Sequence, residues 1–594
     1  MFRNLRPLAP YLRKYRTTFY IGALCVLCNN TVWILFPMVI RDAVRDLNTH
    51  VTRQPLLKYS LYLLAIAAAK AVFQYLTRWI LIGVSREIEF DLRNDLFAHL
   101  EQLSYSYYQR TRTGDIMARM TNDLNAVRML VGPGIMYTAN TIVFTAVSLV
   151  FMLSISPELT LFAFLPLPIF SIVVQYFGRQ IHERFERIQA MFSEISARAQ
   201  ENFSGARLIR AYVQEEAEIE LFERANEEYI GRSLKLVRLM GMLWPTLETL
   251  LGVAIVIVLF VGGREVIQHR INVGDFAAFN TNMVQLTWPI IALGWVINIF
   301  QRGTASLRRI ENILEERPEV TDADVPTTGA PTTLRGEIEF RNLSFDYGET
   351  FETQSDDGAH RGTVVLKNVN LRVPAGTSLA IVGPTGSGKS TLVSLVPRIY
   401  DAAPGSVLID GRSIREFPLQ VLRKNLGFVP QETFLFSDAI RENIAFGAEN
   451  ASDGDVRRVA EAASIASDIE SFPEGYNTVV GERGLTLSGG QKQRTAIARA
   501  LIRNPRILIL DDALSSVDTQ TEDRILNYLR EIMRGRTTIF ISHRVSTVRN
   551  ADRIAVLHDG EIVEYGTHDE LIERNGYYTE LYHKQLLEEE LEVV

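Results

Sequence analysis

Six long runs of apolar residues, all before residue 301, constrain this chain more than any other feature of its sequence. Each is near the ~20 residues that a helix needs to cross about 30 Å of hydrocarbon, and no comparable run follows residue 301. The runs lie near 17–40, 59–84, 132–154, 158–178, 243–263 and 276–300. We therefore predict six membrane-spanning α-helices in the N-terminal half, rather than a set of buried helices in a soluble core.

Lys and Arg are spread unevenly over the connections, and cytoplasmic connections are the ones that carry an excess of them. Residues 1–16 hold five, 85–131 hold six and 179–242 hold ten, whereas 154–160 hold none. The connection 41–58 holds four, which weakens the contrast there. We expect a multi-pass protein of a bacterial-type cytoplasmic (inner) membrane, with both termini in the cytoplasm and no cleavable signal peptide.

The two basic segments, 85–131 and 179–242, are long, amphipathic and mostly helix-forming. Breaks at Thr113–Gly114 and Ser204–Gly205 would lie at the far tips of helices that leave the membrane and return. We predict a transmembrane domain over 1–316, followed by a Pro-, Thr-, Asp- and Gly-rich linker over 317–335. From 336 to 594, short β-rich runs alternate with helical stretches, which is typical of an α/β domain. This domain ends in a short acidic tail.

A glycine-rich loop follows the predicted strand 378–382 and opens a helix, which is the context that a phosphate-binding loop requires. Glycines let backbone N–H groups wrap phosphates, Lys389 supplies positive charge to the β- and γ-phosphates, and the Ser390 hydroxyl can ligate Mg²⁺. The loop reads Gly383, Pro384, Thr385, Gly386, Ser387, Gly388, Lys389, Ser390 and Thr391.

Two further motifs support a nucleotide site. The apolar strand 507–510 ends in Asp511, which would hold Mg²⁺, and Asp512, at the position that normally polarises the attacking water. A second helix start, about 100 residues after Lys389, offers amide groups to a phosphate. It consists of Leu487, Ser488, Gly489, Gly490 and Gln491.

Together these residues resemble an exporter-type ABC half-transporter of the multidrug-resistance kind, over essentially the whole chain. The resemblance implies a P-loop ATPase fold for 336–594, with 383–391 as Walker A, 507–511 as Walker B and 487–491 as the signature. It further implies that Tyr347 stacks on adenine, that Gln431 senses Mg²⁺ and that His543 contacts the γ-phosphate. By the same resemblance Ser515 and Asp518 belong to the D-loop, and 113–123 and 205–212 are coupling helices.

The sequence departs from this family at Asp512, where the family usually has Glu. The carboxylate is one methylene shorter, about 1.5 Å of reach, and misplacement of ~1 Å can cost ~100-fold in rate. Half-transporters with this change resemble the weakly active partner of a heterodimer, so we expect a second half-transporter as partner; a homodimer stays open. Residues 349–363 add an acidic loop, which we expect to be a surface insertion without chemistry.

Polar residues interrupt three of the apolar runs. They are Lys70, Arg78, Glu248, Asn280, Asn282 and Gln285. Intramembrane ionisable groups are costly and often line a pathway; snorkelling, or pairing within the bundle, is the other interpretation, and the sequence does not separate the two. Cys25 and Cys28 form C-x-x-C inside the first run, where small packing residues are favoured over a redox or metal site.

The function predicted from these features is ATP- and Mg²⁺-dependent export of a small amphipathic molecule, drug-like or lipid-like, by alternating access. Membrane lipids are expected neighbours, and the net charge of −7 makes nucleic acid a poor partner. The alternative is a nucleotide-gated channel or sensor on the same fold that does not pump.

Overall fold

The computed structural model describes residues 2–49, 53–329, 331–348, 364–481, 487–514, 535–542 and 544–592. By contacts the chain divides into two units. The first comprises Met1–Leu96 and Ala118–Ile313, and the second comprises Phe97–Met117 and Leu314–Val594. Within the predicted linker, residues 317–329 and 331–335 contain no helix or strand.

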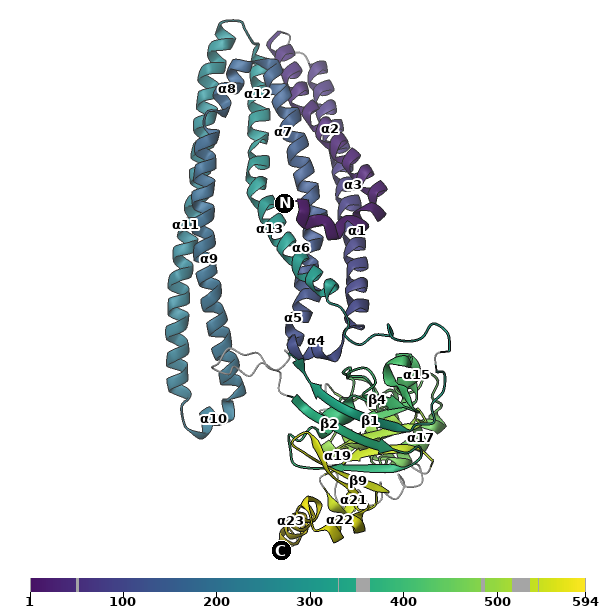
Figure 1. Ribbon diagram of the computed structural model, residues 1–594. Helices are drawn as coiled ribbons and strands as arrows, with labels where there is room; N and C mark the ends of the chain where they lie inside the picture. The colour runs from purple at the N-terminus through teal and green to yellow at the C-terminus, as the bar shows by residue number, and fades with distance from the viewer. Residues whose placement is uncertain are drawn as a thin grey trace. The chain divides into compact units, whose positions relative to one another are not determined.

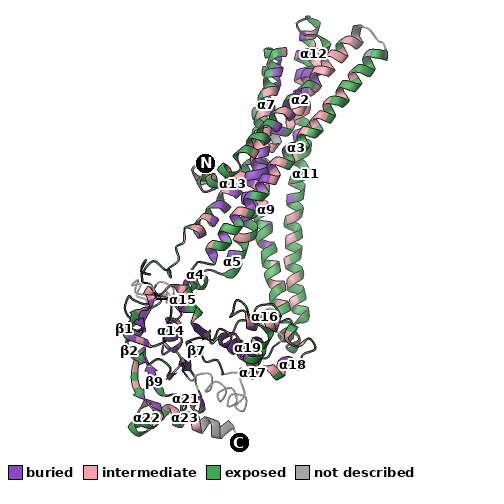
Figure 2. Cartoon of the chain, turned by 90° about the vertical axis from the view of Figure 1, so that its right-hand side faces the viewer, coloured by how far each residue is buried: buried purple, intermediate pink, exposed green. Residues whose placement is uncertain are grey.

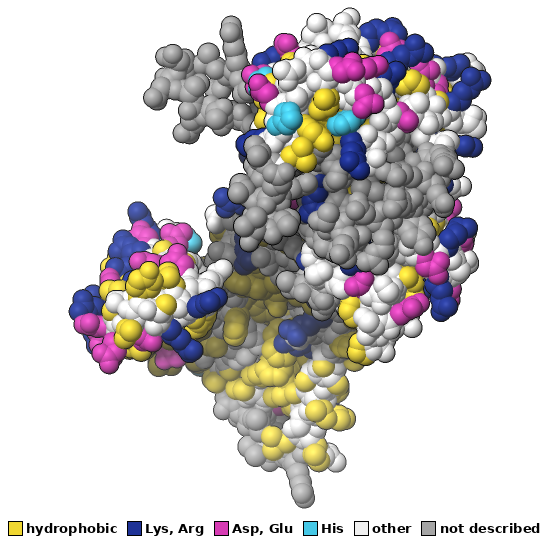
Figure 3. Space-filling model, turned by 90° about the horizontal axis from the view of Figure 1, so that it is seen from below, with side chains coloured by type: hydrophobic (Ala, Val, Ile, Leu, Met, Phe, Trp, Pro, Cys, Tyr) yellow, Lys and Arg dark blue, Asp and Glu magenta, His cyan; other side chains and the backbone are white. Residues whose placement is uncertain are grey.

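The first unit is helical, as predicted, and among the residues that the structure describes six helical stretches are long and apolar enough to cross a membrane. Their regular helices are α2 (Arg16–Thr49), α3 (Arg53–Leu100), α7 (Ile135–Ile155), α9 (Leu167–Ser204), α11 (Glu215–Ile267) and α13 (Thr287–Glu315). Shorter elements are η1 (Phe2–Leu8), α1 (Ala9–Lys14), α8 (Pro157–Phe164), α10 (Ala206–Ala211) and α12 (Val273–Gln285). Figure 3, a view from below, shows yellow hydrophobic side chains gathered in its lower central part.

The third span is one helical stretch, Thr113–Ile155, that contains two π-turns. It runs through α5 (Thr113–Ala118), η2 (Arg119–Asp123), α6 (Leu124–Met129) and η3 (Leu130–Gly134) into α7. Pro133 accounts for η3, because proline lacks the N–H of a regular helical hydrogen bond. Close packing fixes the same turn: a Cβ on Gly132 would lie 2.5 Å from the Ser85 hydroxyl of α3.

Helices α9 and α11 lie side by side and are joined by the short helix α10, as Figure 1 shows. At 53 residues, α11 is about 80 Å long, more than twice the hydrocarbon thickness. Much of the surface of this pair is exposed (Figure 2). The predicted second tip, 205–212, corresponds to α10 and its flanking residues.

The second unit is built on two sheets. The antiparallel sheet has the order β2-β1-β4-β5, from β1 (Ile338–Asp346), β2 (Val364–Val373), β4 (Val407–Ile409) and β5 (Arg412–Ser413). The larger sheet has the order β10-β9-β3-β8-β7-β6. Its strands are β3 (Ser378–Val382), β6 (Leu426–Val429), β7 (Ile507–Asp511), β8 (Thr537–Ile541), β9 (Arg553–His558) and β10 (Glu561–Gly566). All its pairs are parallel except β9 with β10.

The central strands of the larger sheet, such as β7, carry unbroken runs of apolar residues because both of their faces are buried. On β7, Ile507 and Ile509 face the core shared with the antiparallel sheet, while Leu508 and Leu510 face the core under the helices. A strand buried on both faces needs apolar residues at every position. Helices around the sheets include α14 (Lys389–Ser394), α15 (Leu419–Lys424), α16 (Ile440–Ala445), α17 (Asp453–Ala462), α18 (Ala466–Ser471) and α19 (Gly489–Leu501). Near the C-terminus α21 (Val545–Val548), α22 (His568–Arg574) and α23 (Tyr577–Glu592) follow. The predicted class, a six-helix membrane domain followed by an α/β ATPase-type domain, is confirmed.

Candidate functional site

The glycine-rich loop between β3 and α14 forms a narrow cradle. Gly383, Gly386 and Gly388 all have positive φ, at 152°, 84° and 99°. A Cβ on Gly383 would lie 2.0 Å from the carbonyl oxygen of Leu557, and one on Gly388 would lie 2.9 Å from Leu366. Only glycine fits these two positions, so the loop backbone approaches its neighbours closely, as in loops whose N–H groups bind phosphate.

Lys389 is the first residue of α14 and is buried. Its ammonium donates to the carbonyl oxygens of Gly383 at 2.9 Å and Pro384 at 2.8 Å. Burial lowers the pKa of Lys389, while the carboxylates of Asp511 and Asp512 oppose that shift. A cation held by neutral carbonyls in a glycine cradle is well placed to receive an anionic phosphate. The buried Ser387 hydroxyl, also in this loop, has no hydrogen-bond partner within the described part of the chain.

Two oxygen-bearing side chains meet between the start of α14 and the end of β7. The Ser390 hydroxyl donates to the Asp511 carboxylate at 3.0 Å. Asp511 is buried as the last residue of β7, and Asp512 follows it in a left-handed conformation with φ of 48°. The Asp512 N–H donates to the Ile541 carbonyl of β8 at 3.1 Å. A hydroxyl beside a carboxylate is an oxygen donor set that suits Mg²⁺, so these residues fit that ion.

One cavity of about 320 Å³ brings together nine of the predicted site residues, from three separate parts of the chain. Gln431, just after β6, reaches this cavity, as do Asp511 and Asp512 after β7. Its lining also includes Thr385, Gly386, Gly388, Lys389, Ser390 and Thr391. The cavity lies where parallel strands end in loops, which is where open α/β sheets bind ligands.

Tyr347 follows β1 and lies beside this cavity. Its hydroxyl shares a 2.7 Å hydrogen bond with the Thr391 hydroxyl, and its ring makes edge contacts with Phe345 and Tyr400, both at 5.1 Å between centroids. Burial raises the pKa of Tyr347, so its phenol stays protonated at neutral pH. One hydrogen bond and two T-shaped ring contacts therefore fix the position of the Tyr347 ring beside the cavity.

A contact that sequence reasoning missed extends this aromatic cluster to the helix α4 (Tyr105–Arg110), which belongs to the same unit. The Tyr105 ring lies 6.0 Å from that of Tyr400, and the Tyr400 hydroxyl donates to Gln109 at 2.9 Å. Burial is the main reason that the pKa of Tyr400 rises to about 12.

Polar contacts tie the same segment to the chain after α13. The Ser106 hydroxyl donates to Glu319 at 2.6 Å, and Arg110 lies 3.4 Å from the carboxylates of both Glu316 and Glu319. The coupling segment predicted at 113–123 forms α5 and η2 at the start of the third span, and its role stays a prediction. By contacts, residues 97–117, with α4 at their centre, belong to the same unit as the nucleotide site.

The predicted signature forms the start of α19. Ser488 caps this helix through a reciprocal pair of hydrogen bonds with Gln491. The Gln491 amide also donates to Asp468 at 3.0 Å, and Arg494 donates to the same carboxylate at 2.8 Å. Asp468 therefore orients the signature helix, a role that no motif in the sequence indicated. None of 487–491 lines the cavity beside Lys389.

Several predicted residues lie outside the described part of the chain. These are His543, Ser515, Asp518 and the insertion 349–363. Their roles stay predictions.

Comparison with known proteins agrees with this geometry. Residues 19–290 match the family described as ABC transporter transmembrane region, and residues 366–515 match the ABC transporter family. The chain is 36% identical over 589 residues to "Probable multidrug resistance ABC transporter ATP-binding/permease protein YheI" of Bacillus subtilis, covering 99% of this chain and 98% of that protein. It is 35% identical over 592 residues to an "ATP-dependent lipid A-core flippase" of Syntrophus aciditrophicus, covering 100% and 95% respectively.

A solved structure described as a bacterial Atm1-family ABC exporter with ATP bound superposes with a TM-score of 0.77 at 30% identity, covering 96% of this chain and 98% of that one. The chain therefore belongs to the ABC transporter family, with the exporter arrangement of a membrane domain followed by an ATPase domain. It is a nucleotide-binding, ATP-hydrolysing transporter of a bacterial membrane, with its ATPase domain on the cytoplasmic side.

Proposed function

We propose that the chain exports a small amphipathic molecule, drug-like or lipid-like, across the cytoplasmic membrane by alternating access. The observation that carries this proposal is the combination, in one chain, of six apolar spans with a complete phosphate cradle beside Asp511 and Asp512. Relatives named for multidrug resistance and for lipid A-core flipping support an amphipathic cargo. Both termini would lie in the cytoplasm with the ATPase domain.

In this proposal Lys389 leaves the loop carbonyls and binds the β- and γ-phosphates of ATP, while the amides of the loop wrap them. Ser390, Asp511 and Gln431 would hold Mg²⁺, which would screen the phosphate charge and help to orient the γ-phosphate for in-line attack. Asp512 orients the attacking water, His543 contacts the γ-phosphate, and Tyr347 stacks on adenine. The assignments of Lys389, Ser390, Gln431, Asp511 and Asp512 are supported by the cavity that they share, and those of Tyr347 and His543 by the resemblance.

The working unit would be a dimer of half-transporters. Amide groups at Ser488–Gly490 open a helix but do not line the cavity at Lys389. A signature from a second ATPase domain would therefore complete each ATP site, with Ser515 and Asp518 near the interface. Exposed apolar side chains around α10, including Leu208 and Tyr212, give the chain a tip suited to packing on a partner.

Asp512 favours a heterodimer in which this chain contributes the weaker hydrolytic site. Its side chain is one methylene shorter than the usual Glu, and its backbone has the left-handed φ of 48° that Asp adopts more readily than most residues. In such a dimer this chain's Ser488 would complete the partner's stronger site. The two residues should then respond differently to mutation.

Steady-state ATPase activity of the purified native assembly tests this asymmetry. Asp512→Asn should cost little, because that carboxylate already contributes little. Ser488→Arg should remove most activity, because a bulky cation blocks the amides that would hold the partner's γ-phosphate. Equal, near-complete losses in both variants would mean a homodimer with Asp512 active in both sites.

A nucleotide-gated channel or sensor is the second candidate, and the short carboxylate of Asp512 is what favours it. ATP-dependent uptake of cargo into inverted vesicles against its gradient separates the two functions. A channel would only equilibrate the cargo, whereas an exporter accumulates it.

A further inference from the structure

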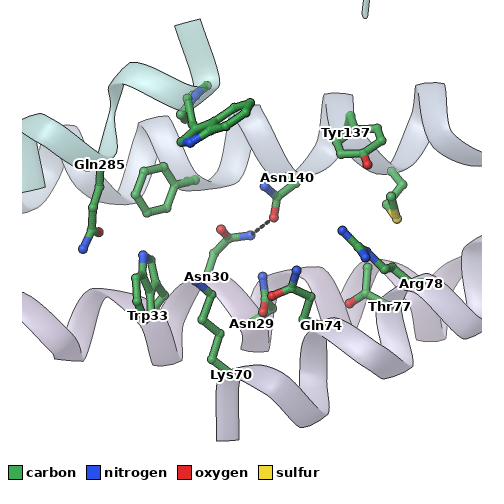
Figure 4. A pocket seen from close by; sticks show the side chains of 14 residues that line it. Asn29, Asn30, Trp33, Lys70, Gln74, Thr77, Arg78, Tyr137, Asn140 and Gln285 are labelled. Carbon is green, nitrogen blue, oxygen red and sulfur yellow. Dashed lines mark hydrogen bonds between the residues drawn. The ribbon is translucent and has the colours of Figure 1, made fainter. Parts of the chain in front are cut away.

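A polar cavity lies inside the membrane unit, between helices that the sequence presents as almost purely apolar. It has a volume of about 330 Å³, within the range of about 300–1,000 Å³ typical of ligand sites. Side chains from α2, α3 and α7 and from the junction of α12 with α13 line it, as Figure 4 shows. All of these residues belong to the first unit.

The polar lining residues come from the middle of four apolar runs. Asn30, Lys70, Asn140 and Gln285 each lie near the centre of the run that contains them. Near the membrane midplane, polar and ionisable groups are costly and are kept where they serve a function. Four such groups facing one cavity are therefore a stronger indication of a ligand than any of them alone.

Two of the lining residues are cations, and none is acidic. Lys70 and Arg78 lie two turns apart on the same face of α3, and no carboxylate among the described residues is within ion-pairing distance of either. The Lys70 ammonium lies 3.2 Å from the centroid of the Trp33 ring. This cation–π contact stabilises the charge but does not neutralise it.

Unused hydrogen-bonding groups point to the same conclusion. Asn29 and Thr77 are more than nine-tenths buried, yet the Asn29 side-chain oxygen and the Thr77 hydroxyl have no partner within the described part of the chain. The side-chain oxygen of Gln285 is likewise unpaired. Buried polar atoms without partners are rare, because each costs the free energy of its lost hydration. Asn30 differs, since its amide donates to Asn140 at 3.0 Å (Figure 4).

Apolar and aromatic surface completes the lining. Trp33, Phe144 and Trp288 border the same space as the two cations. A ligand that fits carries an acidic group for Lys70 and Arg78, hydroxyl or amide groups for the unpaired oxygens, and an apolar body for the aromatic rings.

We propose that this cavity binds the acidic headgroup of an amphiphile, so that the cargo of the transporter is an amphipathic anion. The proposal rests on the proposed export function but names a narrower class of cargo. Lys70 binds the acidic group, and Arg78, about 12 Å further along α3, extends the cationic face toward the cytoplasmic half of the span. An acidic lipid and a soluble organic acid share this chemistry.

The test uses the purified full-length transporter in phosphatidylcholine nanodiscs without nucleotide. Binding of octyl phosphate and of octyl trimethylammonium, which share an apolar chain and differ in charge, is measured by titration calorimetry. Lys70→Met should weaken octyl phosphate binding roughly 10- to 100-fold, the loss that goes with one charge-assisted hydrogen bond, and leave the cationic probe unaffected. Lys70→Arg should retain the anion.

The matched control is Lys58→Met, which removes an exposed lysine from the same helix outside the cavity. It should change neither affinity. Equal losses for both probes in Lys70→Met, or wild-type anion affinity in that variant, would overturn the proposal. Phosphatidic acid is then added to the nanodiscs. If it competes with octyl phosphate, the ligand is a lipid; if it does not compete, the ligand is a soluble acid.

Measurements of ATP-driven transport distinguish a failure of the anion site from a failure of the proposed export function. If the wild-type protein accumulates cargo in inverted vesicles but Lys70→Met binds and transports octyl phosphate normally, export stands and the anion site is wrong. If octyl phosphate binds in a Lys70-dependent manner but is never accumulated, the anion site stands and export fails.

Discussion

Gly383 offers the sharpest test of the phosphate-binding loop, because the fold leaves no room there for a side chain. Its φ of 152° is a conformation that residues with a Cβ rarely adopt, at a cost of about 1–3 kcal/mol. In Gly383→Ala the new Cβ would also lie 2.0 Å from the Leu557 carbonyl oxygen, where contacts below 3.0 Å essentially never occur. The loop or the end of β9 must therefore move by about 1 Å.

A shift of that size displaces the groups that position the reacting phosphate. Misplacement by ~1 Å can cost ~100-fold in rate, so we expect Gly383→Ala to lower steady-state ATPase activity by about two orders of magnitude. Affinity for ATP should fall as well, since the loop amides no longer converge. Both quantities are measured on the purified transporter in nanodiscs.

Gly376 provides the matched control at the other end of β3. It too has a left-handed φ, of 79°, but the nearest atom to an added Cβ is a backbone carbon of Gly535 at 3.7 Å, an ordinary contact. Gly376→Ala should cost about 1–2 kcal/mol of stability without moving the phosphate loop, and its ATPase activity should stay close to wild type. Wild-type activity in Gly383→Ala would refute the steric reasoning; equal losses in both variants would mean that the strain acts on folding of the domain.

Other predictions follow from individual contacts. Lys389→Met should weaken ATP binding roughly 10- to 100-fold in an equilibrium binding assay, because one charge-assisted contact is lost; unchanged affinity would contradict its role. Tyr347→Ala should weaken binding of ATP and GTP alike by about 1–3 kcal/mol, whereas Tyr347→Phe keeps the ring and should bind both normally. In the cytoplasmic part of the third helical stretch, the Asp123 carboxylate accepts hydrogen bonds from the Ser306 hydroxyl and the Arg309 guanidinium, both at 2.8 Å. Asp123→Asn removes the charge that strengthens these bonds, so thermal unfolding followed by tryptophan fluorescence should show the variant less stable than wild type at neutral pH; equal stability would contradict the role of this cluster.

Sequence patterns predicted the elements whose structure depends on neighbouring residues in the chain, namely the membrane spans, the buried strands and the phosphate loop. A span needs about 20 apolar residues, and a parallel strand buried on both faces needs apolar residues without alternation. The apolar run at 17–40 therefore predicts a membrane-spanning helix, and the run at 507–510 predicts a buried strand. The phosphate loop is equally local, since Gly383 and Gly388 must be glycine for reasons of backbone conformation and contact.

Contacts between segments that are far apart in the chain could hardly be predicted from the sequence. Gln109 and Tyr400 are 291 residues apart, so no spacing in the sequence connects α4 with the aromatic cluster beside Tyr347. The sequence did offer one signal, the cluster of tyrosines at 105–108 directly after Ser104. The Thr113–Gly114 break predicted nearby lies at the first residues of α5, directly after the non-helical residues 111–112, so the chain turns between α4 and α5.

The polar residues inside the apolar runs show where sequence and structure must be combined. From sequence, Lys70 could equally snorkel to the interface, pair with an acid or line a pathway. Hydropathy places it near the midplane, too deep for easy snorkelling, and the helix packing places it beside Trp33 with no acidic residue in the same lining. Since an unneutralised charge at that depth lowers stability, its retention is explained most directly by an anion that enters from outside the chain. The negative charge of the cargo is thus inferred from Lys70, whose positive charge no acidic residue of the cavity lining neutralises, rather than from any sequence motif.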